Sequence, residues 1–68
     1  MSKFSKRLKE LRTDEKLSQA ALGLAIGYSQ QTIADWENDR IIPNMTALIK
    51  LAQFFETSID YLVGLKDF

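Results

Sequence analysis

Apolar residues recur along the chain at the spacing of helical turns. Phe4, Leu8 and Leu11 are separated by four and then three residues, with lysines and arginines between them. This pattern is typical of an amphipathic helix and predicts one from residue 2 or 3 to about residue 14. No segment alternates apolar and polar residues over the length of a strand. The pattern therefore predicts an all-α protein.

Capping residues divide the rest of the chain into four more helices. Residues that favour a helix N-cap stand before each of them: Ser18, Ser29, Asn44 and Ser58. The expected helices cover about residues 18–25, 29 to 37 or 38, 44–55 and 58–63. Gly27 and Gly64 supply the left-handed residue that ends a helix sharply. The fourth expected helix is apolar on one side, at Met45, Leu48, Leu51, Ala52 and Phe55. We expect one compact five-helix domain over residues 1–68.

The third expected helix has two different faces. At about 100° per residue, small polar residues fall within one arc of roughly 140°: Gln30, Gln31, Ala34, Asp35 and Asn38. Ile33 and Trp36 point the opposite way. Glutamine and asparagine amides can pair with base edges in the major groove of DNA, and an aspartate can accept from cytosine N4. The alternative is an ordinary solvated helix face, although such a face more often carries glutamate–lysine pairs.

The preceding helix has the features of a partner for this one. Leu22 and Ile26 are placed to pack against Ile33 and Trp36, and Gly23 lies on the same side, where a large side chain would hold the helices apart. A helix-turn-helix unit needs this spacing, because one helix must cross the DNA backbone while the next enters the groove. We expect such a unit at about residues 18–37.

Composition excludes several other classes of protein. The 68 residues include no cysteine and no histidine, so disulfides, thiolate metal sites and the commonest general base are absent. The longest apolar run, residues 20–26, is far shorter than the roughly 18 residues of a membrane span, and no signal peptide is present. Asp35 and Asp39 could hold a divalent ion only weakly, and nothing around them supplies a nucleophile or base. We expect neither an enzyme nor a cofactor.

Charge is balanced overall but unevenly distributed. The formal net charge is zero, whereas residues 1–16 carry six basic and three acidic side chains. Residues 17–68 carry three basic and six acidic ones. DNA responds to the local field, so the basic first segment favours binding to nucleic acid. It is also compatible with a plain solvated helix face.

Five segments together resemble the lambda-repressor-like helix-turn-helix family, of the Cro/cI or xenobiotic-response-element type, over about residues 4–64. They are LKELR at 8–12, LSQAAL at 17–22, IGYSQQTIADWEN at 26–38, the proline at 43 and SIDYLVG at 58–64. The resemblance implies a compact five-helix fold whose third helix recognises DNA. Phage repressors of this family use paired glutamines in that helix.

The resemblance also implies roles for particular residues. Those expected to face base edges are Gln30, Gln31 and Asp35. Those expected to contact phosphates or support such contacts are Gln19, Ser29, Thr32, Asn38 and Arg40. Gln19 resembles a family glutamine that also braces the first residue of the recognition helix. Arg12 and Glu37 match a pair that often forms a structural, partly buried ion pair.

These observations predict a sequence-specific transcriptional regulator of double-stranded DNA, specifically a repressor. We expect a homodimer on a palindromic operator in the cytoplasm of a bacterium or phage-infected cell, without a small-molecule effector in this domain. The dimer contact is expected at the fifth helix and tail, near Tyr61, Leu65 and Phe68. The alternative is a protein-interaction module on the same fold, such as an antitoxin-like partner or anti-repressor. Ile41 and Ile42 would then form an exposed patch rather than pack under their loop.

Overall fold

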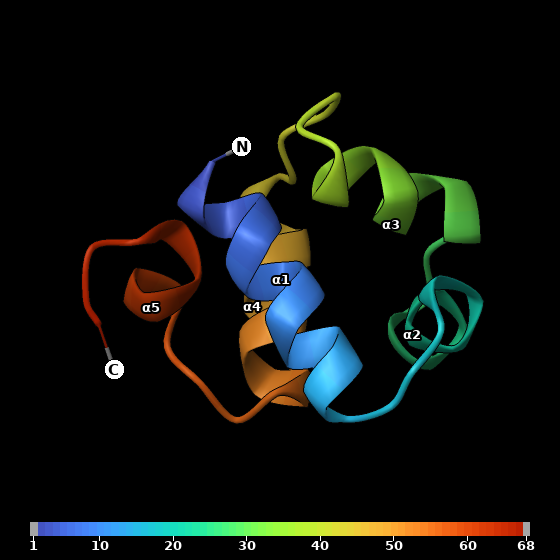
Figure 1. Ribbon diagram of the computed structural model, residues 1–68, viewed down its shortest axis with the longest axis horizontal. Coiled ribbons are helices and arrows are strands. Elements are labelled where there is room, and N and C mark those ends of the chain that lie inside the picture. Colours follow the sequence, from blue (N-terminus) through green and yellow to red (C-terminus); the bar gives the residue numbers. More distant parts are fainter. Residues whose placement is uncertain (1, 68) are drawn as a thin grey trace.

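Five α-helices form the regular structure of residues 2–67, the part of the chain that the computed structural model describes. They are α1 (Lys3–Asp14), α2 (Gln19–Ile26), α3 (Gln30–Glu37), α4 (Met45–Phe54) and α5 (Ile59–Val63). In Figure 1, α1 passes in front of α4, with α2 and α3 on one side and α5 on the other. α2 packs on α3, and α5 contacts both α1 and α4. The predicted all-α, five-helix fold is confirmed.

Each helix begins where a polar side chain accepts a hydrogen bond from the backbone one turn ahead. The capping residues are Ser2, Ser18, Ser29, Asn44 and Ser58. These caps satisfy N–H groups that have no partner within the helix. α2 and α5 end at Gly27 and Gly64, whose φ angles of 85° and 90° lie in the left-handed region. α2 ends at Ile26, one residue later than the sequence predicts.

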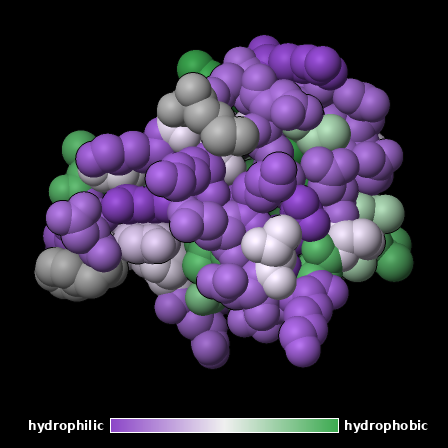
Figure 2. All heavy atoms as spheres, viewed as in Figure 1, coloured by the Kyte–Doolittle hydropathy of each residue, from purple (hydrophilic) through white to green (hydrophobic). Residues whose placement is uncertain are grey.

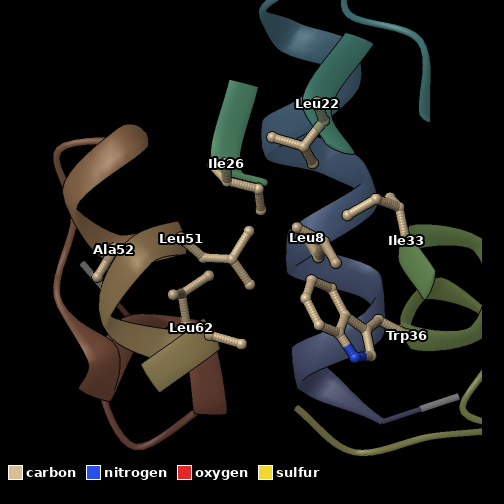
Figure 3. Packing of buried hydrophobic residues seen from close by; sticks show 9 residues of the cluster. Leu8, Leu22, Ile26, Ile33, Trp36, Leu51, Ala52 and Leu62 are labelled. Atoms are coloured by element: carbon tan, nitrogen blue, oxygen red, sulfur yellow. The ribbon is translucent and has the colours of Figure 1, made fainter. Parts of the chain in front are cut away.

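The core is a cluster of nine buried residues contributed by all five helices: Leu8, Leu22, Ile26, Ile33, Trp36, Ala47, Leu51, Ala52 and Leu62. In Figure 3 Leu8 of α1 lies at the centre, surrounded by Leu22, Ile33, Trp36, Leu51 and Leu62. The expected packing of α2 on α3 is present. Met45 was expected on the inner side of α4, but it is 61% exposed, and Ala47 is buried instead. Two residues along a helix correspond to about 200°, so burying Ala47 turns Met45 outward.

Gly23 allows α2 to lie close to the turn that precedes α3. A Cβ built at this position would lie 2.4 Å from the carbonyl oxygen of Tyr28, which is a backbone atom. Even an alanine would therefore require the turn to shift, and a larger side chain would separate the helices. The close approach brings the start of α2 alongside α3.

Polar residues dominate the face of the molecule that Figure 2 shows, and apolar residues appear there only in small separate spots. None of the helices within residues 2–67 has the length and apolar character needed to cross a membrane. The same residues contain no group of three or more His, Cys, Asp or Glu side chains placed to hold a metal ion.

Candidate nucleic-acid interface

α3 presents a polar outer face and an apolar inner face. Ile33 is fully buried and Trp36 is 3% exposed, so the inner face is anchored in the core. On the other side, Gln30 and Gln31 are exposed and Asp35 is half-buried. The helix is therefore held from behind while its two glutamines remain accessible. This arrangement suits a helix that inserts into a groove.

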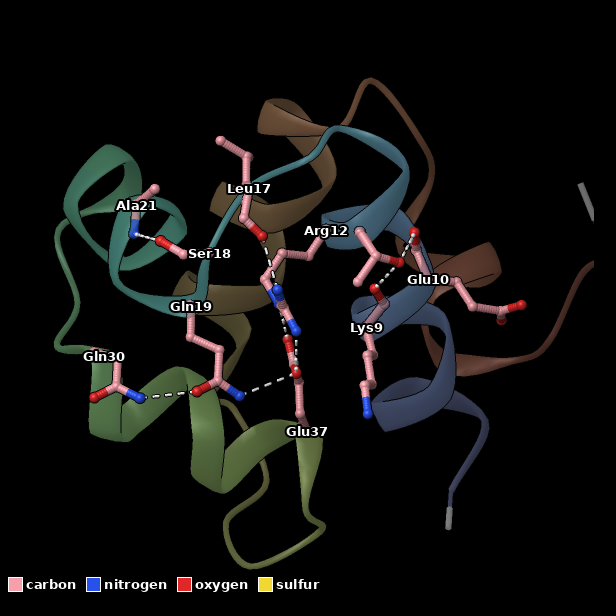
Figure 4. A network of polar contacts seen from close by, with 10 residues as sticks. Lys9, Glu10, Arg12, Leu17, Ser18, Gln19, Ala21, Gln30 and Glu37 are labelled. Atoms are coloured by element: carbon pink, nitrogen blue, oxygen red, sulfur yellow. Dashed lines mark hydrogen bonds and ion pairs between the residues drawn. The ribbon is translucent and has the colours of Figure 1, made fainter.

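One set of hydrogen bonds, which we call the inner network, runs from the start of α3 into the protein. Gln30 Nε2 donates to Gln19 Oε1 over 2.8 Å, and Gln19 Nε2 donates to Glu37 Oε1 over 3.2 Å. Arg12 completes it, with its Nε 2.6 Å from Glu37 Oε2 and its Nη2 3.0 Å from Oε1 (Figure 4). Three helices, α1, α2 and α3, are joined by these four side chains.

The inner end of this network is buried and fully paired. Glu37 is 2% exposed, and the Arg12 side chain is 11% exposed. Arg12 also donates to the carbonyl of Leu17 over 2.7 Å, which holds the loop between α1 and α2. The side-chain hydrogen bonds to Glu37 raise the pKa of Arg12 above its ordinary value. The two hydrogen bonds from the Arg12 guanidinium hold the Glu37 carboxylate in one orientation, and the positive charge of Arg12 balances its negative charge.

A second set of contacts, the outer network, lies on the surface of α3. Gln31 Nε2 donates to Asp35 Oδ1 over 3.0 Å. Arg40 Nη1 lies 3.8 Å from the same oxygen, and its side chain is 68% exposed. The negative charge of Asp35 is thus partly balanced by Arg40, so this face repels anions less than an unpaired carboxylate would.

The remaining predicted contact residues lie at the two ends of α3, with Thr32 inside its first turn. Ser29 Oγ caps the helix by accepting from Thr32 N over 3.1 Å, and it shares a 2.8 Å hydrogen bond with Thr32 Oγ1. At the other end Asn38 is exposed, and Arg40 follows in the loop. Polar groups therefore stand at both ends of the glutamine-bearing face.

Asp39 holds the loop after α3 to the start of α1. Its φ of 59° is left-handed, and its carboxylate accepts from Ser2 N over 2.7 Å and from Ser2 Oγ over 2.6 Å. The hydrogen bonds from the Ser2 hydroxyl and then from its backbone N–H lower the pKa of Asp39. The Ser2 groups that bond to Asp39 are distinct from the Gln31 and Arg40 groups that contact Asp35.

Arg7 is a structural residue that no pattern in the sequence indicates. Its Nη1 donates to the carbonyl of Tyr61 over 2.5 Å and to that of Lys66 over 2.6 Å. Its guanidinium carbon lies 4.3 Å from the centre of the Tyr61 ring. Arg7 and Arg12 both serve the fold, so residues 1–16 offer less free positive charge than the count of basic residues implied.

The segment expected to form the dimer contact is only partly exposed. Tyr61 is half-buried beneath Arg7, whereas Leu65 is 77% exposed. Phe68 lies outside the described residues. The half-burial of Tyr61 reduces the apolar surface that the fifth helix was expected to offer.

Ile41 and Ile42 lie on the surface, with exposed fractions of 51% and 89%. They border an apolar groove of about 340 Å³ between the start of α1, the loop after α3, α4 and α5. The other apolar residues lining it are Phe4, Pro43, Leu48 and Val63. Of the two arrangements that the sequence left open for these isoleucines, the exposed patch is the observed one.

A buried apolar face, an exposed glutamine face and a closely crossing α2 define α3 as the second helix of a helix-turn-helix unit. The family described as "Helix-turn-helix" matches residues 8–62. The chain belongs to this family, the Cro/cI-type helix-turn-helix domain of DNA-binding transcriptional regulators. The expected family is confirmed.

Two curated relatives are similar over most of the chain. The HTH-type transcriptional activator BcrR of Enterococcus faecalis is 34% identical over 61 residues, which are 90% of this chain and 30% of that protein. Repressor protein C2 of Salmonella phage P22 is 36% identical over 60 residues, which are 88% of this chain and 28% of that protein. The chain thus spans less than a third of the length of either relative. One is an activator and the other a repressor.

Solved structures show the same fold. The P22 c2 repressor in complex with a synthetic operator superimposes with a TM-score of 0.84 at 35% identity, covering 88% of this chain and 91% of that one. A structure of Fe(II) HppE with its substrate gives a TM-score of 0.82 at 33% identity, over 91% of this chain but only 36% of that one. The likeness to HppE is confined to its helix-turn-helix domain. The matched family is one of transcriptional regulators, and its helix-turn-helix domain is not an enzyme.

Proposed function

We propose that residues 1–68 form one DNA-binding domain of a sequence-specific transcriptional repressor, which inserts α3 into the major groove of double-stranded DNA. The observation that carries this proposal is the exposed pair Gln30–Gln31 on a helix whose opposite face is buried at Ile33 and Trp36. Side chains on a helix fixed from behind lose little freedom on binding, which favours selective contacts.

In this proposal the outer face of α3 divides into base and phosphate contacts. Gln30 and Gln31 pair with base edges, for which adenine N6 and N7 are the best match, and Asp35 accepts from cytosine N4. The phosphates are contacted by residues around the helix, namely Gln19, Ser29, Thr32, Asn38 and Arg40. Phosphate contacts set the register of the protein on the duplex without carrying sequence information.

The proposed assembly is a homodimer on a palindromic operator. Two copies of α3 would then occupy major grooves about 34–36 Å apart, one turn of the duplex. Repression needs only occupancy of the operator, and P22 C2, similar over 88% of this chain, is a repressor. The proposed location is the cytoplasm, and no cofactor or small-molecule effector is assigned to this domain.

The test is selection of binding sites from a pool of random duplex DNA, followed by fluorescence anisotropy with the selected duplex. We expect an enriched palindrome and an affinity that falls steeply between 50 and 200 mM salt, roughly as the count of phosphate contacts dictates. The double variant Gln30→Ala/Gln31→Ala is the matched control, with helicity checked by circular dichroism. Absence of an enriched sequence together with salt-independent affinity would contradict the proposal.

A protein-interaction module is the second candidate, and the apolar groove beside Ile41 and Ile42 favours it. The two candidates respond to different substitutions. If the cellular phenotype survives Gln30→Ala/Gln31→Ala but is lost in Ile42→Lys, the groove is the functional surface. The opposite pattern supports DNA recognition by α3.

A further inference from the structure

The hydrogen bonds of the inner network have a direction, and this direction limits what Gln30 can offer to a base. Gln19 of α2 stands between the first and last residues of α3, as Figure 4 shows. It accepts from Gln30 on its oxygen and donates to Glu37 from its nitrogen. A glutamine amide has a different chemistry at each of its two ends, so the bonds cannot be exchanged independently.

Glu37 sets the direction of the whole chain of bonds. It is 2% exposed and accepts from Arg12 through both carboxylate oxygens, at 2.6 and 3.0 Å. A carboxylate without a proton only accepts hydrogen bonds, so Gln19 has to turn its NH₂ group toward it. If the Gln19 amide were reversed, its oxygen would face the Oε1 atom of Glu37. Both atoms only accept hydrogen bonds, so each would lose a donor in a site that is largely shielded from water.

We propose that Glu37 is a positioning residue for base recognition: through Gln19 it fixes the side-chain amide of Gln30 with one N–H directed inward. The inference rests on the function proposed above. Because Gln19 presents an oxygen to Gln30, Gln30 uses one N–H there and keeps its carbonyl oxygen and one N–H for the DNA.

This remaining pair of groups matches adenine better than guanine. In the major groove adenine offers a donor at N6 and an acceptor at N7, which complement one oxygen and one N–H. Guanine offers two acceptors, O6 and N7, and a Gln30 with a single free N–H cannot donate separately to both. A buried glutamate that never touches DNA therefore determines the base preference at the Gln30 position.

Two variants separate this role from a purely structural one. Gln19→Ala removes the middle link and leaves the Arg12–Glu37 pair in place. Glu37→Gln keeps a single acceptor oxygen. With that oxygen on Arg12 Nε, the NH₂ takes the place of Oε1, which accepts from both Gln19 and Arg12 Nη2, so the direction reverses at Gln19 and one Arg12 hydrogen bond is lost. Gln19 would then turn its own NH₂ toward Gln30, leaving both Gln30 N–H groups free for the DNA. Gln53→Ala is the matched control, because Gln53 is an exposed glutamine of α4 that belongs to neither network.

The measurement is the ratio of affinities for two duplexes that differ only at the Gln30 position, one with A·T and one with G·C. Both derive from the site that the wild type selects from a random pool, and the position is the one whose preference disappears in Gln30→Ala. We expect the wild type and Gln53→Ala to prefer A·T roughly tenfold, Gln19→Ala to prefer it less than about threefold, and Glu37→Gln to shift toward G·C. Loss of a phosphate contact at Gln19 would weaken both duplexes equally, so the ratio isolates the orientation of Gln30.

A wild-type ratio in Gln19→Ala would overturn the inference while leaving the proposed function intact. If Glu37→Gln fails to fold, Gln19→Ala decides the matter alone. Side-chain amide exchange in the DNA-free protein provides a second measurement: one Gln30 amide proton should exchange slowly in the wild type and rapidly in Gln19→Ala. Equal, rapid exchange in both proteins would also overturn it. Failure to select any site would instead contradict the proposed function.

Discussion

The two polar networks on α3 differ in where they end. The inner network leads from Gln30 to Glu37 and Arg12, whose contact of 2.6 Å lies within the protein. The outer network leads from Gln31 to Asp35 and Arg40, whose 3.8 Å contact involves an arginine side chain that is 68% exposed. The two neighbouring glutamines of α3 are therefore held differently: Gln30 bonds to a network that ends inside the protein, and Gln31 bonds to one that ends at the surface.

Because of this difference, we expect the side chain of Gln30 to keep one orientation on binding DNA and that of Gln31 to be able to change its orientation. Gln30 is oriented by groups that pack with the core, so its contribution to binding depends on the whole fold. Gln31 donates to Asp35 at the surface, where water can take the place of either group, and a hydrogen bond of this kind contributes only about 0.5–1.5 kcal/mol net. We expect the base preference at the Gln30 position to be strict, and that at the Gln31 position to tolerate rearrangement.

The largest expected effect is the loss of stability when the inner network is cut at its buried end. Glu37→Ala leaves Arg12 without its partner and should lower the free energy of unfolding by about 3–5 kcal/mol. Asp35→Ala cuts the outer network and should change it by less than about 1 kcal/mol. Urea denaturation of both variants measures the contrast. Equal losses would show that the two networks do not differ in the way their burial implies.

Gly23→Val tests whether the close approach of α2 holds the inner network together. A valine side chain would meet the Tyr28 carbonyl, since even a Cβ lies 2.4 Å from it. We expect a loss of about 1–3 kcal/mol in unfolding free energy, as for other overpacked sites. Heteronuclear NMR should show shifts of the Gln19 and Gln30 side-chain amides with little change at Gln31. A variant as stable as the wild type, with unchanged amide signals, would contradict this role of the glycine.

Asp39→Asn should have the smallest effect, confined to acid pH. Asp39 has a lowered pKa, so the unfolded state takes up its proton first as the pH falls. The stability that this carboxylate provides is therefore present above the ordinary aspartate pKa of about 3.9 and is lost as the pH falls through the lowered value. Thermal melts between pH 7 and pH 2.5 should show a shallower acid loss of stability in Asp39→Asn than in the wild type. Identical slopes in the two proteins would show that the Ser2–Asp39 contact contributes nothing.

Local signals in the sequence were enough to predict the helices and the helix-turn-helix unit. The caps at Ser18, Ser29 and Asn44 act within one turn of the chain, and the turn at Gly27 depends on one residue. Met45 was misplaced because a helix with apolar residues on several sides does not indicate which side faces the core. The small Ala47 fits beneath the neighbouring helices, and its position fixes the rotation of α4.

The partners of the polar side chains were harder to predict, because they depend on how distant segments pack. Arg7 bonds to carbonyls 54 and 59 residues away, and no pattern in the sequence indicates such a contact. The spacing of Gln31 and Asp35 by four residues is a local signal that would have indicated their bond. The bond between Gln19 and Glu37 depends on how α2 crosses α3, and no sequence pattern predicts it. The contact between Gln19 and Gln30 was expected, because the family resemblance implies it.

The most direct test of α3 as the DNA-contacting element is NMR titration of the ¹⁵N-labelled domain with the duplex selected from a random pool. We predict that the largest chemical-shift changes will occur at the side-chain amides of Gln30 and Gln31 and at the backbone of Ser29. Residues of the apolar groove, such as Ile42 and Val63, should change little. Shifts concentrated at Ile42 and Val63, with the two glutamine amides unmoved, would contradict the account.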